Sequence, residues 1–212
     1  MNEKDSTCEK YDLIAEWFDS SRGKAERLLE SEYLDAMLPA IPPKGSVLDL
    51  GCGSGEPLAG YFIRHRFSVV GVDGAPKMIE MCKARFPEMT WIIGDMRSLD
   101  LDKRFDAVIA WDSFFHLNQA EQRAMFGVFF NHLKKGGMLL FTSGPTAGET
   151  SGMMQGYKFN YSSLAPDEYR RLLAEHGFKL ILHKIEDPAC GNHTVWLAQF
   201  TQSDWFIIQK TL

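Results

Sequence analysis

Cysteine is scarce in this chain. The 4 cysteines among 212 residues stand at positions 8, 52, 82 and 190, and no two of them have the spacing of a CxxC pair. This usage argues against a disulfide framework and against a zinc module, so no metal site is expected. A reduced, cytoplasmic protein is the more natural expectation.

Long apolar runs and long basic runs are also missing. No apolar run approaches the ~20 residues that span a bilayer, and residues 1–10 are polar, so neither a membrane span nor a secretory signal is expected. The 23 basic residues are outnumbered by 28 acidic ones, which gives a net charge of −5, and the longest basic run is Lys134-Lys135. We therefore expect neither a nucleic-acid partner nor a membrane partner.

The remaining composition is that of an ordinary globular protein. Hydrophobic residues make up 45% and charged residues 24% of the chain, which is enough to build a sizeable core. Helical spacing of apolar residues at 10–38 predicts two helices before the core, with a break at 20–23. We expect an N-terminal helical cap at 1–40 and one main domain at 41–212.

Strand and helix patterns alternate along the main domain. Apolar strands are predicted at 47–50, 68–72, 89–93, 105–110 and 138–142, and helices at 58–65, 76–86 and 119–133, the last stopped by Gly136-Gly137. This alternation predicts an α/β fold with a doubly wound parallel sheet and helices on both faces.

The pattern changes after the fifth predicted strand. Residues 143–163 are rich in glycine, serine, threonine and methionine and are long for a connection, so they are predicted to be a substrate-facing insertion or lid. A helix at 166–176 follows. Strands at 179–185 and 194–201 are joined by a loop too short for a crossover helix and should be antiparallel.

A glycine-rich turn follows the first strand. In the segment Asp49-Leu50-Gly51-Cys52-Gly53-Ser54-Gly55, three alternating glycines let the backbone adopt positive φ and approach a ligand closely. Strand, glycine turn and helix N-terminus together are typical of a nucleotide or anion site.

Polar residues also follow the other strands, at the edge where open parallel sheets bind ligands. Asp73-Gly74 follows the second strand, Gly94-Asp95-Met96 the third, and Ala110-Trp111-Asp112 the fourth. A carboxylate at 73 can accept hydrogen bonds from a ribose diol. Asp95 offers an acceptor for an exocyclic amine, and Met96 a soft side chain for a purine face. The predicted ligand contains an adenosine.

These motifs, in this order, resemble the class I S-adenosylmethionine-dependent methyltransferases of the small-molecule type. The resemblance extends over roughly residues 40–200 and includes Leu133-Lys134-Lys135-Gly136-Gly137 and the terminal hairpin, while Tyr11-Asp12-x-x-Ala15 is similar to members that act on small molecules. It implies a seven-stranded sheet of order 3-2-1-4-5-7-6 with strand 7 antiparallel.

The resemblance also implies the contents of the site. The cofactor would be S-adenosyl-L-methionine, the product S-adenosyl-L-homocysteine, and the partner a small-molecule methyl acceptor, with the enzyme a monomer or homodimer. The implied cofactor-binding residues are Tyr11, Asp49, Gly51, Cys52, Gly53, Gly55, Asp73, Gly74, Met78, Gly94, Asp95, Met96, Ala110, Trp111 and Asp112. Trp111 and His116 would face the sulfonium and are the candidates for catalysis.

Other functions remain open at this point. An NAD-dependent oxidoreductase shares the glycine turn and the acidic residue after the second strand, although the spacing G-x-G-x-G and Pro57 disfavour it. A non-catalytic protein that senses the cofactor is the third possibility. The Asn-Pro-Pro-Tyr signature of many base and glutamine methylating enzymes is absent after the fourth strand, which leaves the acceptor atom open.

Two segments are expected to cover the site. One is the N-terminal helix with Tyr11, Trp17 and Phe18, and the other is the insertion, whose large side chains are Met153, Met154, Tyr157 and Phe159.

Overall fold

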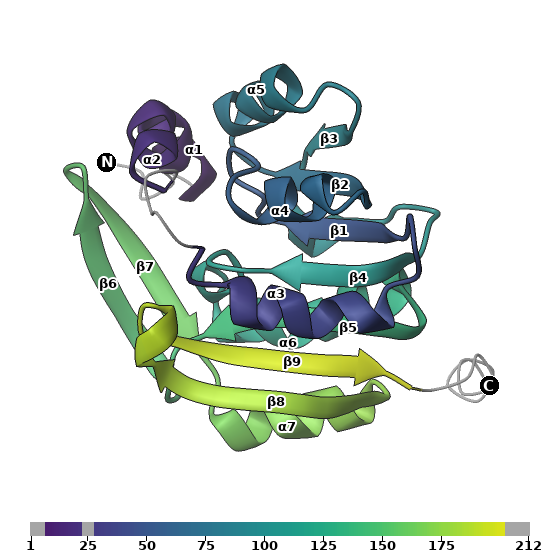
Figure 1. Cartoon of the computed structure of the whole chain (residues 1–212). Helices are drawn as coiled ribbons and strands as arrows, with labels where there is room; N and C mark the ends of the chain where they lie inside the picture. Colours follow the sequence, from purple (N-terminus) through teal and green to yellow (C-terminus); the bar gives the residue numbers. More distant parts are fainter. Residues whose placement is uncertain (1–6, 23–27, 202–212) are drawn as a thin grey trace.

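A seven-stranded mixed sheet forms the centre of the protein, in a computed structural model that describes residues 7–22 and 28–201 (Figure 1). The strands run in the order β3-β2-β1-β4-β5-β9-β8. They are β1 (Ser46–Leu50), β2 (Ser68–Asp73), β3 (Thr90–Ile93), β4 (Phe105–Ala110), β5 (Leu133–Ser143), β8 (Phe178–Asp187) and β9 (His193–Phe200). The first five are parallel, and β9 is antiparallel to both of its neighbours. The predicted sheet order and the reversed terminal hairpin are therefore confirmed.

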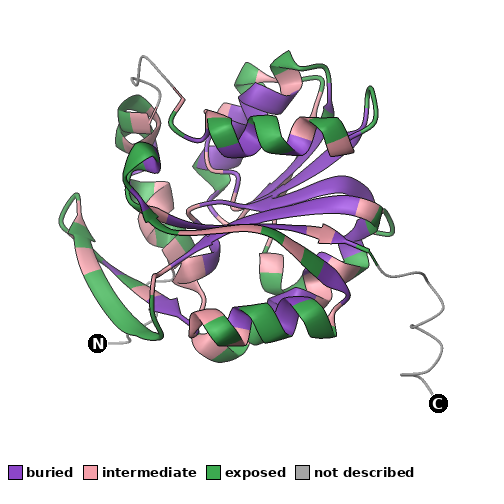
Figure 2. Cartoon of the chain, turned by 60° about the horizontal axis from the view of Figure 1, so that its bottom comes forward, coloured by how far each residue is buried: buried purple, intermediate pink, exposed green. Residues whose placement is uncertain are grey.

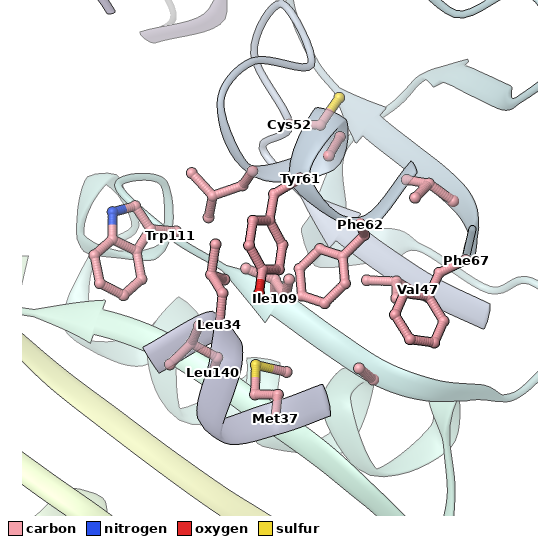
Figure 3. Packing of buried hydrophobic residues seen from close by; sticks show 14 of the residues in the cluster. Leu34, Met37, Val47, Cys52, Tyr61, Phe62, Phe67, Ile109, Trp111 and Leu140 are labelled. Carbon is pink, nitrogen blue, oxygen red and sulfur yellow. The ribbon is translucent and has the colours of Figure 1, made fainter. Parts of the chain in front are cut away.

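Helices cover both faces of the sheet, because alternate residues of each buried strand feed two separate hydrophobic clusters. One face carries α3 (Ser31–Met37), α4 (Leu58–Arg64) and α5 (Pro76–Arg85), and the other carries α6 (Gln119–His132) and α7 (Pro166–Glu175). Figure 2 shows the buried sheet between helices whose outer sides are exposed. On the first face, Leu34 and Met37 of α3 and Phe62 of α4 pack over the sheet (Figure 3). Within the described ranges, no helix is long and apolar enough to cross a membrane.

The N-terminal helices differ in number from the prediction. Two were expected before the core, whereas the described residues hold α1 (Thr7–Leu13), α2 (Ala15–Arg22) and α3, followed by the short 3-10 helix η1 (Leu38–Ala40). A break in the helix was predicted at 20–23, but α2 continues through residues 20–22 and ends at Arg22, so this prediction is wrong for those residues. Residue 23 lies outside the described part. Tyr33, Leu34 and Met37 are fully buried, so α3 belongs to the layer against the sheet.

The end of α6 was also predicted wrongly. The helix starts as expected, with a capping box between Asn118 and Glu121. It ends at His132, however, and β5 starts at Leu133, so Gly136-Gly137 lies inside the strand and does not stop the helix. The cause is Leu133, which is fully buried and pairs with Phe105 of β4.

The predicted insertion is a β-hairpin that stands apart from the main sheet. It consists of β6 (Gly148–Met154) and β7 (Tyr157–Ser163), joined by a two-residue turn in which Gln155 and Gly156 have φ of 50° and 81°. The hairpin and the pair α1–α2 lie beside the carboxyl ends of β1 to β4 (Figure 1). The sheet therefore presents its ligand-binding edge to both segments.

Candidate active site

The larger of two adjoining cavities lies at the carboxyl ends of β1 to β4 and has a volume of about 590 Å³. Most of the residues predicted for the cofactor site line it: Tyr11, Asp49, Gly51, Cys52, Gly53, Asp73, Gly74, Met78, Gly94, Asp95, Met96, Trp111 and Asp112. His116, predicted on the substrate side, lines it as well. Gly55 and Ala110 are not among its lining residues. A Cβ on Gly55 would meet Cys82 and Trp91, and Ala110 is fully buried in β4.

The glycine turn presents bare backbone to this cavity. Gly51 (φ 74°) is required by packing, because a Cβ there would lie 2.2 Å from the Cβ of Ser113. Gly53 (φ 53°) has open space instead: a Cβ there would meet only the ring of Phe18, at 3.6 Å. The backbone at Gly53 can therefore be approached closely from the cavity.

Asp73 fixes the conformation of this turn. Its Oδ2 accepts a hydrogen bond from the N–H of Gly53 at 2.9 Å, and its Oδ1 accepts one from the N–H of Ala75 at 2.8 Å. Burial raises the pKa of the Asp73 carboxyl, and the two backbone donors oppose that rise. Each oxygen keeps a second acceptor site, so the carboxylate can bind a further donor in the cavity.

Asp95 has a partner that the sequence did not reveal. Its carboxylate caps the 3-10 helix η2 (Met96–Ser98) and forms an ion pair with the guanidinium of Arg97 at 2.6 Å. Hydrogen bonding to Arg97 holds the pKa of Asp95 below its ordinary value. Arg97 also forms an ion pair with Glu121 of α6. The pair connects Asp95, the residue predicted to contact the adenine, with α6, and all three side chains line the cavity.

Asp49 is the most deeply buried carboxylate of the cavity wall. Its side chain is 4% exposed, and burial, together with the charge of Asp73, raises its pKa to about 7. A carboxyl group with such a pKa responds strongly to a cation placed beside it.

The second cavity, of about 550 Å³, lies between the hairpin β6–β7 and the start of β9. Tyr11, Phe18, Arg22 and Asp112 line both cavities, so the two spaces adjoin each other at these side chains. Of the side chains expected to form covers, Tyr11 and Phe18 lie here and Phe159 packs on Tyr11 with ring centroids 4.8 Å apart. Two others point elsewhere: Met153 is 69% and Trp17 41% exposed.

His116, on the 3-10 helix η3 (Phe114–His116), is held in one neutral tautomer. Its Nδ1 lies 3.2 Å from the carbonyl oxygen of Asn160 and therefore carries the proton, which leaves Nε2 to accept the hydroxyl proton of Tyr11 at 2.9 Å. Burial lowers the pKa of His116 in agreement with this assignment. The lone pair of Nε2 is occupied by this contact, so His116 holds the Tyr11 hydroxyl in place beside the larger cavity.

Asp112 stands between two cations. Its Oδ2 lies 2.6 Å from Nη1 of Arg22, and its Oδ1 lies 2.8 Å from Nε2 of His193. Burial works against protonation of His193, but the hydrogen bond and charge of Asp112 outweigh it and raise the pKa of His193. Burial likewise favours neutral Asp112, yet the two cations keep its pKa below the ordinary value. Arg22 also contacts Glu30 at 3.4 Å.

Sequence reasoning missed Arg22 and gave His193 no functional role. Arg22 could have been found, because Tyr11, Ala15, Phe18 and Arg22 follow one another at the four-, three- and four-residue spacing of a single helix face. His193 has no such signal, since only the pairing of β9 with β5 brings it beside Asp112.

Comparison with known proteins agrees with this geometry. Residues 47–137 match the methyltransferase domain family, and the resemblance found in the sequence is confirmed. The dTDP-3-amino-3,4,6-trideoxy-alpha-D-glucopyranose N,N-dimethyltransferase of Streptomyces venezuelae is 30% identical over 132 residues, which are 61% of this chain and 54% of that enzyme. This chain spans about half the length of the curated relatives it matches.

Solved structures share the fold. An S-adenosylmethionine-bound amino pentose methyltransferase of Micromonospora echinaspora, involved in calicheamicin biosynthesis, superposes with a TM-score of 0.66 at 22% identity, over 87% of this chain and 96% of its own. The glycopeptide N-methyltransferase MtfA, with S-adenosyl-L-homocysteine, gives 0.65 at 21% identity, over 82% and 91%. The oxidoreductase alternative gains no support, because the sheet ends in an antiparallel hairpin where the dinucleotide-binding fold continues in parallel.

Proposed function

We propose that this protein is an S-adenosylmethionine-dependent methyltransferase that methylates a nitrogen atom of a small molecule. One observation carries the proposal. A cavity built from the ends of β1 to β4 adjoins a second cavity under the hairpin, and Tyr11 and Asp112 stand at the junction. The Streptomyces venezuelae relative and MtfA support nitrogen as the acceptor atom, since both are described as N-methyltransferases.

The residues present fit the cofactor. Gly53 offers an open backbone approach. Trp111 carries a buried indole N–H that has no hydrogen-bond partner among the described residues, and this N–H is turned away from the other labelled side chains in Figure 3. In this proposal Gly51, Cys52 and Gly53 lie against the methionine moiety, and Asp73 binds the ribose. The adenine lies between Gly94, Asp95 and Met96.

The chemistry then needs little from the protein beyond placement. The bound cofactor supplies a methyl group on a sulfonium, which is already a good leaving group. Tyr11 and His116, joined by their hydrogen bond, border the reacting atoms and exclude water. Ala110 and Trp111 support the wall on the sulfonium side.

The proposal includes the organisation of the whole protein. Of the predicted cap 1–40, α1 and α2 act as the cap over the domain at 41–212, whereas α3 belongs to the layer on the sheet, and the hairpin at 148–163 covers the acceptor. We further propose a cytoplasmic enzyme, monomeric or homodimeric, without a nucleic-acid partner; the net charge of −5 supports the last point.

Calorimetry and a transfer assay test the proposal together. We expect S-adenosyl-L-homocysteine to bind with one site per chain, and S-adenosyl-L-methionine to be consumed in the presence of at least one member of a panel of small amines, alcohols and thiols. Absence of cofactor binding refutes the proposal. Binding without transfer to any acceptor supports the sensing alternative instead.

A further inference from the structure

We propose that Asp112 is the acceptor-binding carboxylate of this enzyme, which holds the nitrogen of an amine substrate, and that Arg22 and His193 position it. This inference rests on the proposed function. It differs from the sequence interpretation, which placed Asp112 in the cofactor site. Asp112 lines both cavities, and its side chain is 18% exposed, so it can be reached from the acceptor side.

The backbone at Asp112 is held in an unusual conformation. Asp112 has φ of 50°, a region that residues other than glycine rarely occupy. Its N–H donates to Oγ1 of Thr142, a fully buried residue of β5, at 2.9 Å. Such conformations persist where surrounding contacts enforce them and are common at functional sites. Here the contact with β5 directs the carboxylate across the end of the sheet, toward α2 and β9.

The two polar contacts of His193 favour its protonated form, in line with the raised pKa of this residue. Nε2 faces Oδ1 of Asp112, and Nδ1 lies 2.5 Å from the carbonyl oxygen of Cys190. Both neighbours are acceptors, so only the doubly protonated ring satisfies both contacts. The ring also lies against Trp111, with centroids 5.3 Å apart, which fixes its orientation.

The cluster is therefore balanced before a substrate arrives. Arg22 and His193 supply two positive charges, and Asp112 and Glu30 two negative ones. Oδ1 of Asp112 is buried against His193, whereas Oδ2 contacts Arg22 and has a second acceptor site left for a ligand. A carboxylate kept ionised in this way, and partly open to the cavity, is suited to accept N–H bonds from an amine.

The reaction would strengthen this contact. The nitrogen lone pair forms a bond to the methyl carbon, the carbon–sulfur bond breaks with its electron pair on sulfur, and the nitrogen becomes positively charged until its proton is lost to solvent. An anion placed beside the nitrogen stabilises the charge that develops there. Tyr11 lines the same junction as an uncharged side chain, hydrogen-bonded to His116 of the larger cavity.

Asp112→Asn is the direct test, with Asp167→Asn as a matched control, because the side chain of Asp167 is fully exposed on α7 and lines neither cavity. The amine is taken from the panel above, and binding is also measured calorimetrically on the S-adenosyl-L-homocysteine complex with glucosamine and with its uncharged counterpart glucose. We expect Asp112→Asn to bind S-adenosyl-L-homocysteine within twofold of wild type, to bind the amine at least tenfold more weakly, and to raise its KM accordingly. Asp167→Asn should stay within threefold throughout.

A second variant tests the positioning role independently of whether Asp112→Asn folds. In His193→Gln a neutral donor can replace the cation, so KM for the amine should rise about fivefold while kcat at saturation stays within threefold.

Three results overturn the inference. They are a loss of S-adenosyl-L-homocysteine binding in Asp112→Asn, unchanged amine binding in both variants, and glucosamine binding to wild type no better than glucose when no panel amine is methylated. Failure of wild type to bind the cofactor refutes the proposed function instead, so the two failures are distinguishable.

Discussion

Replacing Asp73 with asparagine should weaken the binding of S-adenosyl-L-homocysteine at least tenfold and leave the sheet folded. The carboxylate accepts N–H bonds from Gly53 and Ala75 on separate oxygens. Asparagine has a single acceptor oxygen, so its amide group must face one of these donors. The variant therefore loses a charge-assisted bond to the turn, and also the charge offered to the ribose diol.

The size of the effect follows from these contacts. A hydrogen bond to a charged group contributes about 1.5–3 kcal/mol, which corresponds to a roughly 10- to 150-fold change in the dissociation constant. Stability should change less, because burial opposes ionisation of Asp73 and the neutral side chain removes that cost. The protein should therefore unfold at nearly the same temperature while the cofactor dissociates more easily.

Titration calorimetry on wild type, Asp73→Asn and Asp167→Asn decides the point, with circular dichroism as the check on folding. Asp167 is the control because its side chain is fully exposed on α7, away from the site. A folded Asp73→Asn protein whose dissociation constant lies within twofold of wild type would refute the role given to Asp73.

Four further predictions follow from the same site. Gly53→Val should abolish cofactor binding with the fold largely intact, because a branched side chain at φ of 53° fills the approach beside Phe18; Gly127→Ala in α6, where a Cβ has open space, should bind normally by calorimetry. The pKa of Asp49 is raised to about 7, so the folded protein binds more protons than the unfolded chain between about pH 4 and 7, and its unfolding free energy should fall as pH rises through that window. This decrease in unfolding free energy is at most about 4 kcal/mol, because the pKa shift is about three units. Urea denaturation at several pH values should detect it in wild type and not in Asp49→Asn. Tyr11→Phe should bind S-adenosyl-L-homocysteine normally and lower kcat/KM about fivefold, as expected for one lost neutral hydrogen bond to His116; unchanged turnover would remove Tyr11 from the reaction. Hydrogen exchange in α1, α2 and the hairpin should slow when cofactor and acceptor bind, and deletion of residues 1–20 should lower turnover more than it lowers sheet stability; equal protection with and without ligand contradicts a covering role.

The sheet and the cofactor cavity could be predicted from the sequence because their signals are local. Each parallel strand is a short apolar run, and the residues that line the larger cavity follow those runs directly, as Asp73 follows β2. The carboxyl ends of parallel strands lie at the same edge of the sheet, so these residues come together independently of the loop conformations. Even so, Asp95 could not be understood from its position alone, because its partner Arg97 competes for both carboxylate oxygens.

The acceptor cavity could not be predicted in the same way. β6 is largely exposed and therefore needs few apolar side chains. Residues 143–163 accordingly lack the alternation of apolar and polar residues that would indicate strands. The turn Gln155-Gly156 is a recognisable hairpin signal only once strands are suspected on both sides. The cluster at Asp112 depends on Arg22 and His193, which come from opposite ends of the chain, and no local pattern joins them.

Contacts of Tyr11 connect the two segments proposed to cover the site, the helices α1–α2 and the hairpin β6–β7. Its ring lies against Phe159 of β7 and against Phe18 of α2, at 4.8 and 5.3 Å between centroids, and its hydroxyl reaches His116, whose other nitrogen is bonded to β7. Lys10 adds a bond from α1 to the carbonyl oxygen of Lys158 at 3.0 Å. Neither α1–α2 nor the hairpin can leave the site without breaking these contacts. Because Tyr11 lines both cavities, the proposed covering role implies that displacing either segment would open the cofactor side and the acceptor side together.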